Sequence, residues 1–152
     1  MVQEGNPAPD FELPSDTGEI VRLSDLRGRP VVLYFYPKDD TPGCTTEARG
    51  FRDAYSELEQ RRARVLGVSP DTEASHASFK AKHGLQFTLL ADVDHEVAER
   101  YGVWVERTRD GRTSMGINRS TFVIDAEGRV ARAMLGVSPE GHAAEVLEAL
   151  PG

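Results

Sequence analysis

Continuous apolar runs alternate along the chain with segments in which apolar residues recur every three or four positions. The first pattern is typical of strands buried on both faces, and the second of helices that bury one face. The strongest strand signal is Val31-Val32-Leu33-Tyr34-Phe35-Tyr36, which ends at Pro37. Further strands are predicted at residues 65–68, 87–91, 121–124 and 130–134, and helices at about 42–58, 71–83, 94–101 and 139–150.

Two hairpins, a short turn and a loop complete the predicted pattern. Residues 11–13 and 20–23 flank the turn residues Asp16-Thr17-Gly18, and the last two strands flank residues 125–128. Residues 24–28 read as a brief helical turn, and residues 106–116 are polar and contain glycine, so we expect an exposed loop there. The order of elements predicts an α/β fold, in which a central mixed sheet is flanked by helices, with residues 1–152 forming one domain.

Composition narrows the functional classes. The chain has 25 acidic and 18 basic side chains and a formal net charge of −7, so it is a poor binder of phosphate backbones and nucleic acid is not expected as a partner. Apolar runs are too short to cross a bilayer, and residues 1–6 lack the pattern of a signal peptide. We therefore expect a cytoplasmic protein without a membrane partner.

The cysteine and histidine content carries the first chemical information. One cysteine cannot form an internal disulfide, which fits a reducing compartment. The four histidines are dispersed, and the spacing typical of metal ligands is absent, so we expect neither a metal nor another cofactor.

The cysteine, Cys44, lies between the most apolar strand and a long helix. Thr41 is a good N-cap and Pro42 a good first helical residue, which places Cys44 in the first turn. Its thiol would lie near unpaired backbone N–H groups and the positive end of the helix dipole, and both favour the reactive thiolate. A free cysteine is more often a small buried hydrophobe. The polar, proline-rich neighbours favour the reactive interpretation here.

A thiolate also needs a cation, and three are candidates. Lys38 is expected to be a solvated loop charge, and Arg49, five residues after Cys44, is expected on the helix surface. Arg119 opens a predicted strand, and periodicity alone leaves open whether it is an ordinary strand-end charge.

At this point the sequence resembles the peroxiredoxin family. Pro37, Thr41 and Cys44 match its Pro-x-x-x-Thr-x-x-Cys motif, and residues 37–47 look like the bacterioferritin-comigratory, or PrxQ, branch. The resemblance runs from residues 5–11 through 101–104 to 119–125. It implies a thioredoxin fold with an N-terminal hairpin extension, and a thiol peroxidase that reduces hydrogen peroxide and organic hydroperoxides.

The resemblance also implies roles for individual residues. Cys44 would attack a peroxide oxygen and become a sulfenic acid, Thr41 would hydrogen-bond the peroxide, and Arg119 would stabilise the thiolate and the developing charge. Pro37 would shield the sulfur. These roles agree with the chemistry, because peroxide cleavage needs a thiolate and preorganised donors.

Two further residues are candidates for the substrate-binding region. The backbone N–H of Gly43, with that of Cys44, would complete the track for the peroxide oxygens. Glu47 would orient Arg119, although a favourable acid in the first helical turn is an equally good interpretation.

One departure from the branch changes the expected turnover. Many members carry a resolving cysteine five residues after the peroxidatic one, where this chain has Arg49, and residues 72–83 contain no cysteine either. We therefore predict that an external thiol (thioredoxin, glutaredoxin or a small thiol) reduces Cys44. Members of the branch are often monomers, and a monomer is expected here.

Two other functions are alternatives to a peroxidase. A dithiol oxidoreductase would need a Cys-x-x-Cys pair, and position 47 is glutamate, so that interpretation fails. A non-catalytic thioredoxin-fold module, or a peroxide sensor that passes its oxidation to a partner protein, stays open. Turnover of peroxide with an added thiol separates the enzyme from the sensor.

Overall fold

The centre of the fold is β3 (Val31–Phe35), whose five residues are all buried. In the computed structural model, which describes residues 2–151, β3 lies in a five-stranded sheet of order β5-β4-β3-β8-β9. It pairs in parallel with β4 (Arg64–Ser69), which pairs in parallel with β5 (Thr88–Ala91). On its other side it pairs antiparallel with β8 (Ser120–Ile124), which pairs with β9 (Val130–Leu135). The predicted central mixed sheet is therefore confirmed.

Successive residues of β3 point into two different cores. Val31, Leu33 and Phe35 belong to one cluster of buried side chains. The alternate residues Val32 and Tyr34, continued by Tyr36, belong to the other. A strand whose neighbouring side chains enter two cores must be apolar throughout, which explains the continuous run in the sequence.

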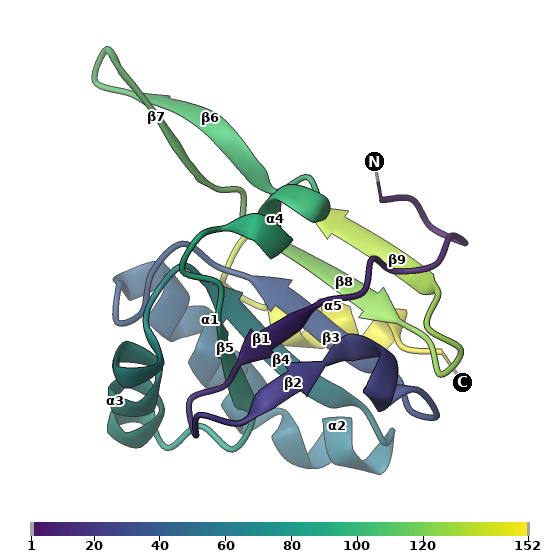
Figure 1. Ribbon diagram of the computed structural model, residues 1–152. Coiled ribbons are helices and arrows are strands. Elements are labelled where there is room, and N and C mark those ends of the chain that lie inside the picture. Colours follow the sequence, from purple (N-terminus) through teal and green to yellow (C-terminus); the bar gives the residue numbers. More distant parts are fainter. Residues whose placement is uncertain (1, 152) are drawn as a thin grey trace.

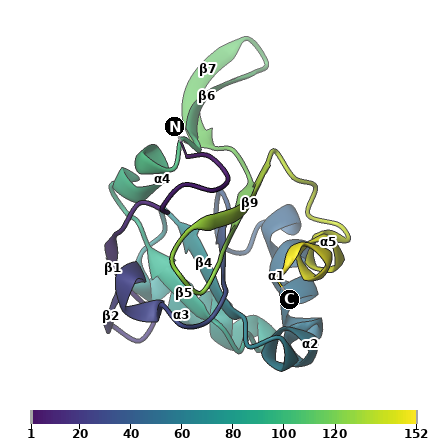
Figure 2. The ribbon, with the colours of Figure 1, turned by 90° about the vertical axis from the view of Figure 1, so that its right-hand side faces the viewer.

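Different elements cover the two faces of the sheet (Figures 1 and 2). One face is covered by the hairpin of β1 (Glu12–Pro14) and β2 (Ile20–Arg22), a 3₁₀ turn (Leu23–Leu26) and α4 (Glu96–Arg100). The other is covered by α1 (Pro42–Asp53), α2 (Tyr55–Gln60), α3 (Glu73–His83) and α5 (His142–Ala149). This is the thioredoxin-type arrangement with an N-terminal hairpin that the resemblance implies.

The prediction of an exposed loop at residues 106–116 is wrong. The chain there forms a hairpin of β6 (Trp104–Arg109) and β7 (Arg112–Ile117), which projects from the body of the molecule (Figure 1). Most of its side chains are exposed, so the strands lack the alternation that marks a half-buried strand. The sequence feature that indicates this hairpin is Asp110-Gly111. Both residues have positive φ, as a tight two-residue hairpin turn requires.

Several predicted helix boundaries also move. The first long helix breaks at Ala54, so that α1 and α2 are separate. The cap of α3 is Thr72, whose hydroxyl accepts the Ser75 N–H at 3.1 Å, and not Asp71. The helix predicted from residue 94 starts at Glu96, and the helix predicted from residue 139 starts at His142, after Gly141 turns the chain with φ +73°. Within residues 2–151, none of the helices has the length and hydropathy that crossing a membrane would need.

Candidate active site

Cys44 lies where the sequence places it, in the first turn of α1. Thr41 is the N-cap in an extended conformation (φ −87°, ψ 157°), Pro42 is the first helical residue, and Cys44 is the third. The helix follows β3, so the thiol lies beyond the carboxyl end of the central strand. Cys44 is 1% exposed. The sulfur therefore combines a helix N-terminus with exclusion of bulk water, in which helix-end charges act more strongly.

Arg119 contacts the sulfur although it lies 75 residues further along the chain. It immediately precedes β8, and the pairing of β8 with β3 aligns Ser120 with Phe35 and brings Arg119 to the end of the central strand. Its Nη2 group donates a hydrogen bond to Cys44 Sγ at 3.4 Å. The other two candidate cations, Lys38 and Arg49, are exposed, as predicted.

Glu47 holds the other side of the same guanidinium. It lies one turn after Cys44 on α1, its side chain is buried, and its Oε1 accepts a hydrogen bond from Arg119 Nη1 at 2.7 Å. Burial acts to lower the pKa of Arg119, but the negative charges of Glu47 and Cys44 outweigh it and raise that pKa. Arg119 is therefore a fixed cation whose two terminal nitrogens face a carboxylate and a thiol.

The carboxyl of Glu47 is itself strongly perturbed. Burial raises its pKa from 4.5 to about 7, although the charge of Arg119 and the hydrogen bond from it act in the opposite direction. Its second oxygen, Oε2, has no hydrogen-bond partner among residues 2–151. Because burial penalises the charged carboxylate more than the contact with Arg119 stabilises it, Glu47 holds a proton more readily than an exposed glutamate does.

Tyr34 belongs to the same buried region, and sequence reasoning treated it only as part of a strand. Its hydroxyl is buried and likewise lacks a hydrogen-bond partner in the described chain. Burial first, and then the charge of Glu47, raise its pKa well above the ordinary value, so it stays a neutral phenol. A Cβ at Gly67 would lie 2.9 Å from the Tyr34 hydroxyl, so a glycine there makes room for this ring.

The remaining predicted site residues lie close to Cys44 in the sequence, in the loop before α1 and in the first turn of α1. The Thr41 hydroxyl donates to the Lys38 carbonyl at 2.9 Å, which leaves its oxygen available as an acceptor. Pro37 is half-buried. A Cβ at Gly43 would lie 3.0 Å from Arg119 Nη2 and 3.6 Å from Pro139 Cγ. The absence of a side chain at Gly43 thus lets the guanidinium approach α1, a role that the sequence did not indicate.

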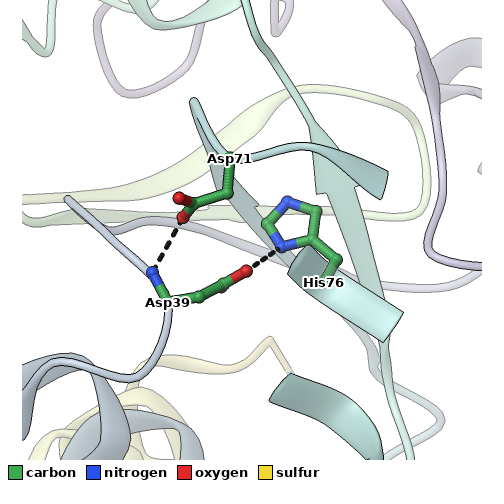
Figure 3. A group of neighbouring side chains, drawn as sticks. All are labelled: Asp39, Asp71 and His76. Carbon is green, nitrogen blue, oxygen red and sulfur yellow. Dashed lines mark hydrogen bonds and ion pairs between the residues drawn. The ribbon is translucent and has the colours of Figure 1, made fainter. Parts of the chain in front are cut away.

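A second polar cluster lies beside this loop (Figure 3). Asp39, Asp71 and His76 bring one potential metal-ligand atom each within 4.8 Å of one another. From the sequence, the histidines are dispersed and Asp71 is expected to cap a helix. A signal was nevertheless present, because Asp39 and Asp71 follow the adjacent parallel strands β3 and β4, whose carboxyl ends lie at one edge of the sheet.

Comparison with known protein families and sequences finds matches over most of the chain. Residues 5–133 match the model of the AhpC/TSA family. A putative peroxiredoxin Bcp of Coxiella burnetii is 51% identical over 96% of this chain and 97% of its own length. The peroxiredoxin Bcp of Bacillus subtilis is 49% identical over 98% of this chain and 95% of its own length.

Solved structures of similar proteins also superpose closely on this chain. A mutant of Xylella fastidiosa PrxQ superposes with a TM-score of 0.92 at 38% identity, covering 97% of this chain and 94% of that one. The bacterioferritin comigratory protein of Xanthomonas campestris, studied for its alkyl peroxide reduction activity, superposes with a TM-score of 0.90 at 38% identity, covering 97% and 96%.

Proposed function

The chain belongs to the AhpC/TSA family and is a peroxiredoxin, a thiol-dependent peroxidase; on this premise we propose that Cys44 reduces hydrogen peroxide and organic hydroperoxides by a one-cysteine cycle. The observation that carries the proposal is the contact between Arg119 Nη2 and Cys44 Sγ at 3.4 Å, in the first turn of α1. A buried thiol paired with a fixed cation at a helix N-terminus is an environment that activates a cysteine.

The oxidising step follows from this geometry. The Cys44 thiolate attacks one oxygen of the hydroperoxide, so that an S–O bond forms while the O–O bond breaks. Sulfur loses two electrons and becomes a sulfenic acid, and the leaving oxygen takes up a proton to give water or an alcohol. The Arg119 guanidinium faces the oxygens on which negative charge develops. The Thr41 oxygen, whose own proton is engaged by Lys38, is free to accept the hydrogen bond of the peroxide O–H.

The supporting residues complete the proposed site. Glu47 orients Arg119 through the 2.7 Å hydrogen bond, which favours this role over that of a simple helix-end acid. Pro37 shields the sulfur from the loop side. Gly43 offers its backbone N–H to the peroxide and admits Arg119 beside α1.

Recycling requires a thiol from outside the chain, because the sequence has one cysteine. A first thiol attacks the sulfenic sulfur, forming a mixed disulfide and releasing water, and a second thiol exchanges with that disulfide to regenerate Cys44. Thioredoxin, glutaredoxin or a small thiol would supply the electrons.

The oligomeric state and the cellular location are part of the same proposal. We expect a single-domain monomer, since the exposed large apolar side chains in the described chain lie on four separate segments: Ile20, Val93, Met115 and Leu135. A reducing cytoplasm would supply the thiols that this cycle needs.

Peroxide consumption with each candidate thiol tests the function. We expect catalytic turnover with at least one reductant and none for Cys44→Ser, since the substitution removes the nucleophile and changes one atom. Oxidation of one equivalent without turnover under all three reductants would instead favour a sensor. Wild-type activity in Cys44→Ser would refute the assignment of the nucleophile.

A further inference from the structure

The loop that precedes the nucleophile is tied to α3 by two consecutive residues. The backbone N–H of Asp39 donates to Asp71 Oδ2 at 2.7 Å, and its carboxylate lies 2.8 Å from His76 Nδ1 (Figure 3). The next residue, Asp40, pairs with Lys82 at 2.7 Å and with His83 at 3.1 Å. We call the contacts of Asp39 with His76 and Asp71 the buried tie, and those of Asp40 with Lys82 and His83 the exposed tie. Residues 37–41, which include Pro37 and Thr41, are thus held by a helix outside the site.

The buried tie is saturated with hydrogen bonds. Asp39 Oδ1 accepts the Tyr36 hydroxyl at 2.5 Å, and Oδ2 accepts the Ser75 hydroxyl at 2.8 Å. His76 is fully buried, and its Nε2 lies 2.9 Å from the Leu90 carbonyl oxygen, which can only accept, so Nε2 carries a proton. The Nδ1–Oδ2 separation is a hydrogen-bond distance, and a proton joins these two atoms. This bonding favours a hydrogen-bonded tether at the cluster rather than a metal site.

The backbone of this loop requires such support. Asp40 has φ +60°, a left-handed conformation that is costly for a residue other than glycine. Thr41 follows directly and begins α1 in an extended conformation. A strained residue next to the N-cap keeps its geometry only if its surroundings fix it, and the Asp39–His76 pair is the buried part of those surroundings.

We propose that Asp39 and His76 are positioning residues for the peroxide step, in which their buried hydrogen bond holds residues 37–41 so that Thr41 meets the peroxide at Cys44. This inference rests on the proposed function of Cys44. It assigns α3 a part in the reaction although neither residue touches the sulfur. Because small displacements of an aligned group can slow a reaction about a hundredfold, a loosened loop would slow peroxide attack more than a reaction that needs only an accessible thiolate.

Two substitutions of His76 separate positioning from simple packing. His76→Asn keeps a donor near the position of Nδ1 and so keeps the bond to Asp39, whereas His76→Gln keeps a donor near Nε2 and the bond to Leu90 only. Lys82→Met is the matched control, since it removes one of the two exposed contacts between the same loop and the same helix and leaves the Asp40–His83 contact in place. Exposed ion pairs contribute little to stability.

The measurement is a pair of rate constants for Cys44, one with hydrogen peroxide and one with iodoacetamide. We expect His76→Gln to lower the peroxide rate constant at least about tenfold, with alkylation as fast as in the wild type or faster. His76→Asn and Lys82→Met should stay within about threefold of the wild type in both reactions.

Each alternative outcome overturns a defined claim. An unchanged ratio of the two rate constants in His76→Gln, or equal losses in the Asn and Gln variants, overturns the positioning role. A wild-type protein that reacts with iodoacetamide and not with peroxide overturns the proposed function itself. If His76→Gln does not fold, Asp39→Asn replaces the carboxylate that bonds His76 while keeping its shape, and an unchanged ratio in that variant overturns the positioning role as well.

Discussion

The buried carboxyl of Glu47 gives the folded protein a pH dependence that a single substitution removes. Its pKa rises from 4.5 to about 7 because burial disfavours the carboxylate. Between these two pH values the unfolded chain releases this proton while the folded chain keeps it. The contribution to stability is therefore fully present below pH 4.5 and is lost as the pH rises through 7.

The size of the effect follows from the same two values. One pH unit corresponds to about 1.4 kcal/mol, so the change from 4.5 to about 7 corresponds to about 3 kcal/mol of unfolding free energy. Glu47→Gln keeps the shape and an oxygen for the 2.7 Å contact with Arg119 but has no proton to release. The wild type should lose about 3 kcal/mol relative to this variant between pH 4.5 and pH 8.

Urea unfolding of both proteins at several pH values measures this difference directly. Comparing the two curves cancels the titration of all other groups, and equal m-values confirm that the same surface unfolds in both. Parallel stability curves for the wild type and Glu47→Gln from pH 4.5 to 8 would refute the argument that Glu47 is a desolvated carboxyl.

Three further predictions test separate contacts. Gly43→Ala should slow peroxide attack at least about tenfold by displacing Arg119, without loss of stability. Gly50→Ala is the control, because its Cβ would meet Ala143 at 3.8 Å and should leave the rate unchanged. Stopped-flow kinetics and thermal melts check both variants, and equal rates in the two would contradict the close approach of Arg119 at Gly43. Arg119→Lys should slow the same step about a hundredfold, since one ammonium group cannot replace the two guanidinium nitrogens that contact Glu47 and Cys44. A wild-type rate constant in this variant would contradict the prediction. Burial lowers the pKa of His142, so the wild type should lose stability below about pH 6.5 relative to His142→Gln; melting temperatures that fall equally in both would disprove it.

The sequence predicts the part of the site that is local in the chain. Thr41, Pro42 and Cys44 form a helix start whose cap and first-turn preferences can be read from three residues, and the structure has that helix start. The role of Arg119 came from the resemblance to a family. Its contact depends on the pairing of β8 with β3, which joins residues 75 positions apart and leaves no periodic signal near either one.

The supporting contacts were beyond sequence reasoning for a related reason. His76 looked dispersed because its partner, Asp39, lies 37 residues earlier, on another element. Asp71 has the residue type of a helix cap, yet the fold turns its carboxylate to the Asp39 N–H and leaves capping to Thr72. The hairpin of β6 and β7 was missed because its strands bury too little to show alternation. Each of these features depends on tertiary contacts rather than on local preference.

Mass spectrometry of the Cys44 peptide tests the central claim most directly. After one equivalent of hydrogen peroxide, we predict a single added oxygen on Cys44, and after addition of a thiol, a mixed disulfide at that residue followed by recovery of the free thiol. An unmodified Cys44 peptide after peroxide has been consumed, or an oxidised Cys44 that thioredoxin, glutaredoxin and small thiols all fail to reduce, would contradict the one-cysteine cycle.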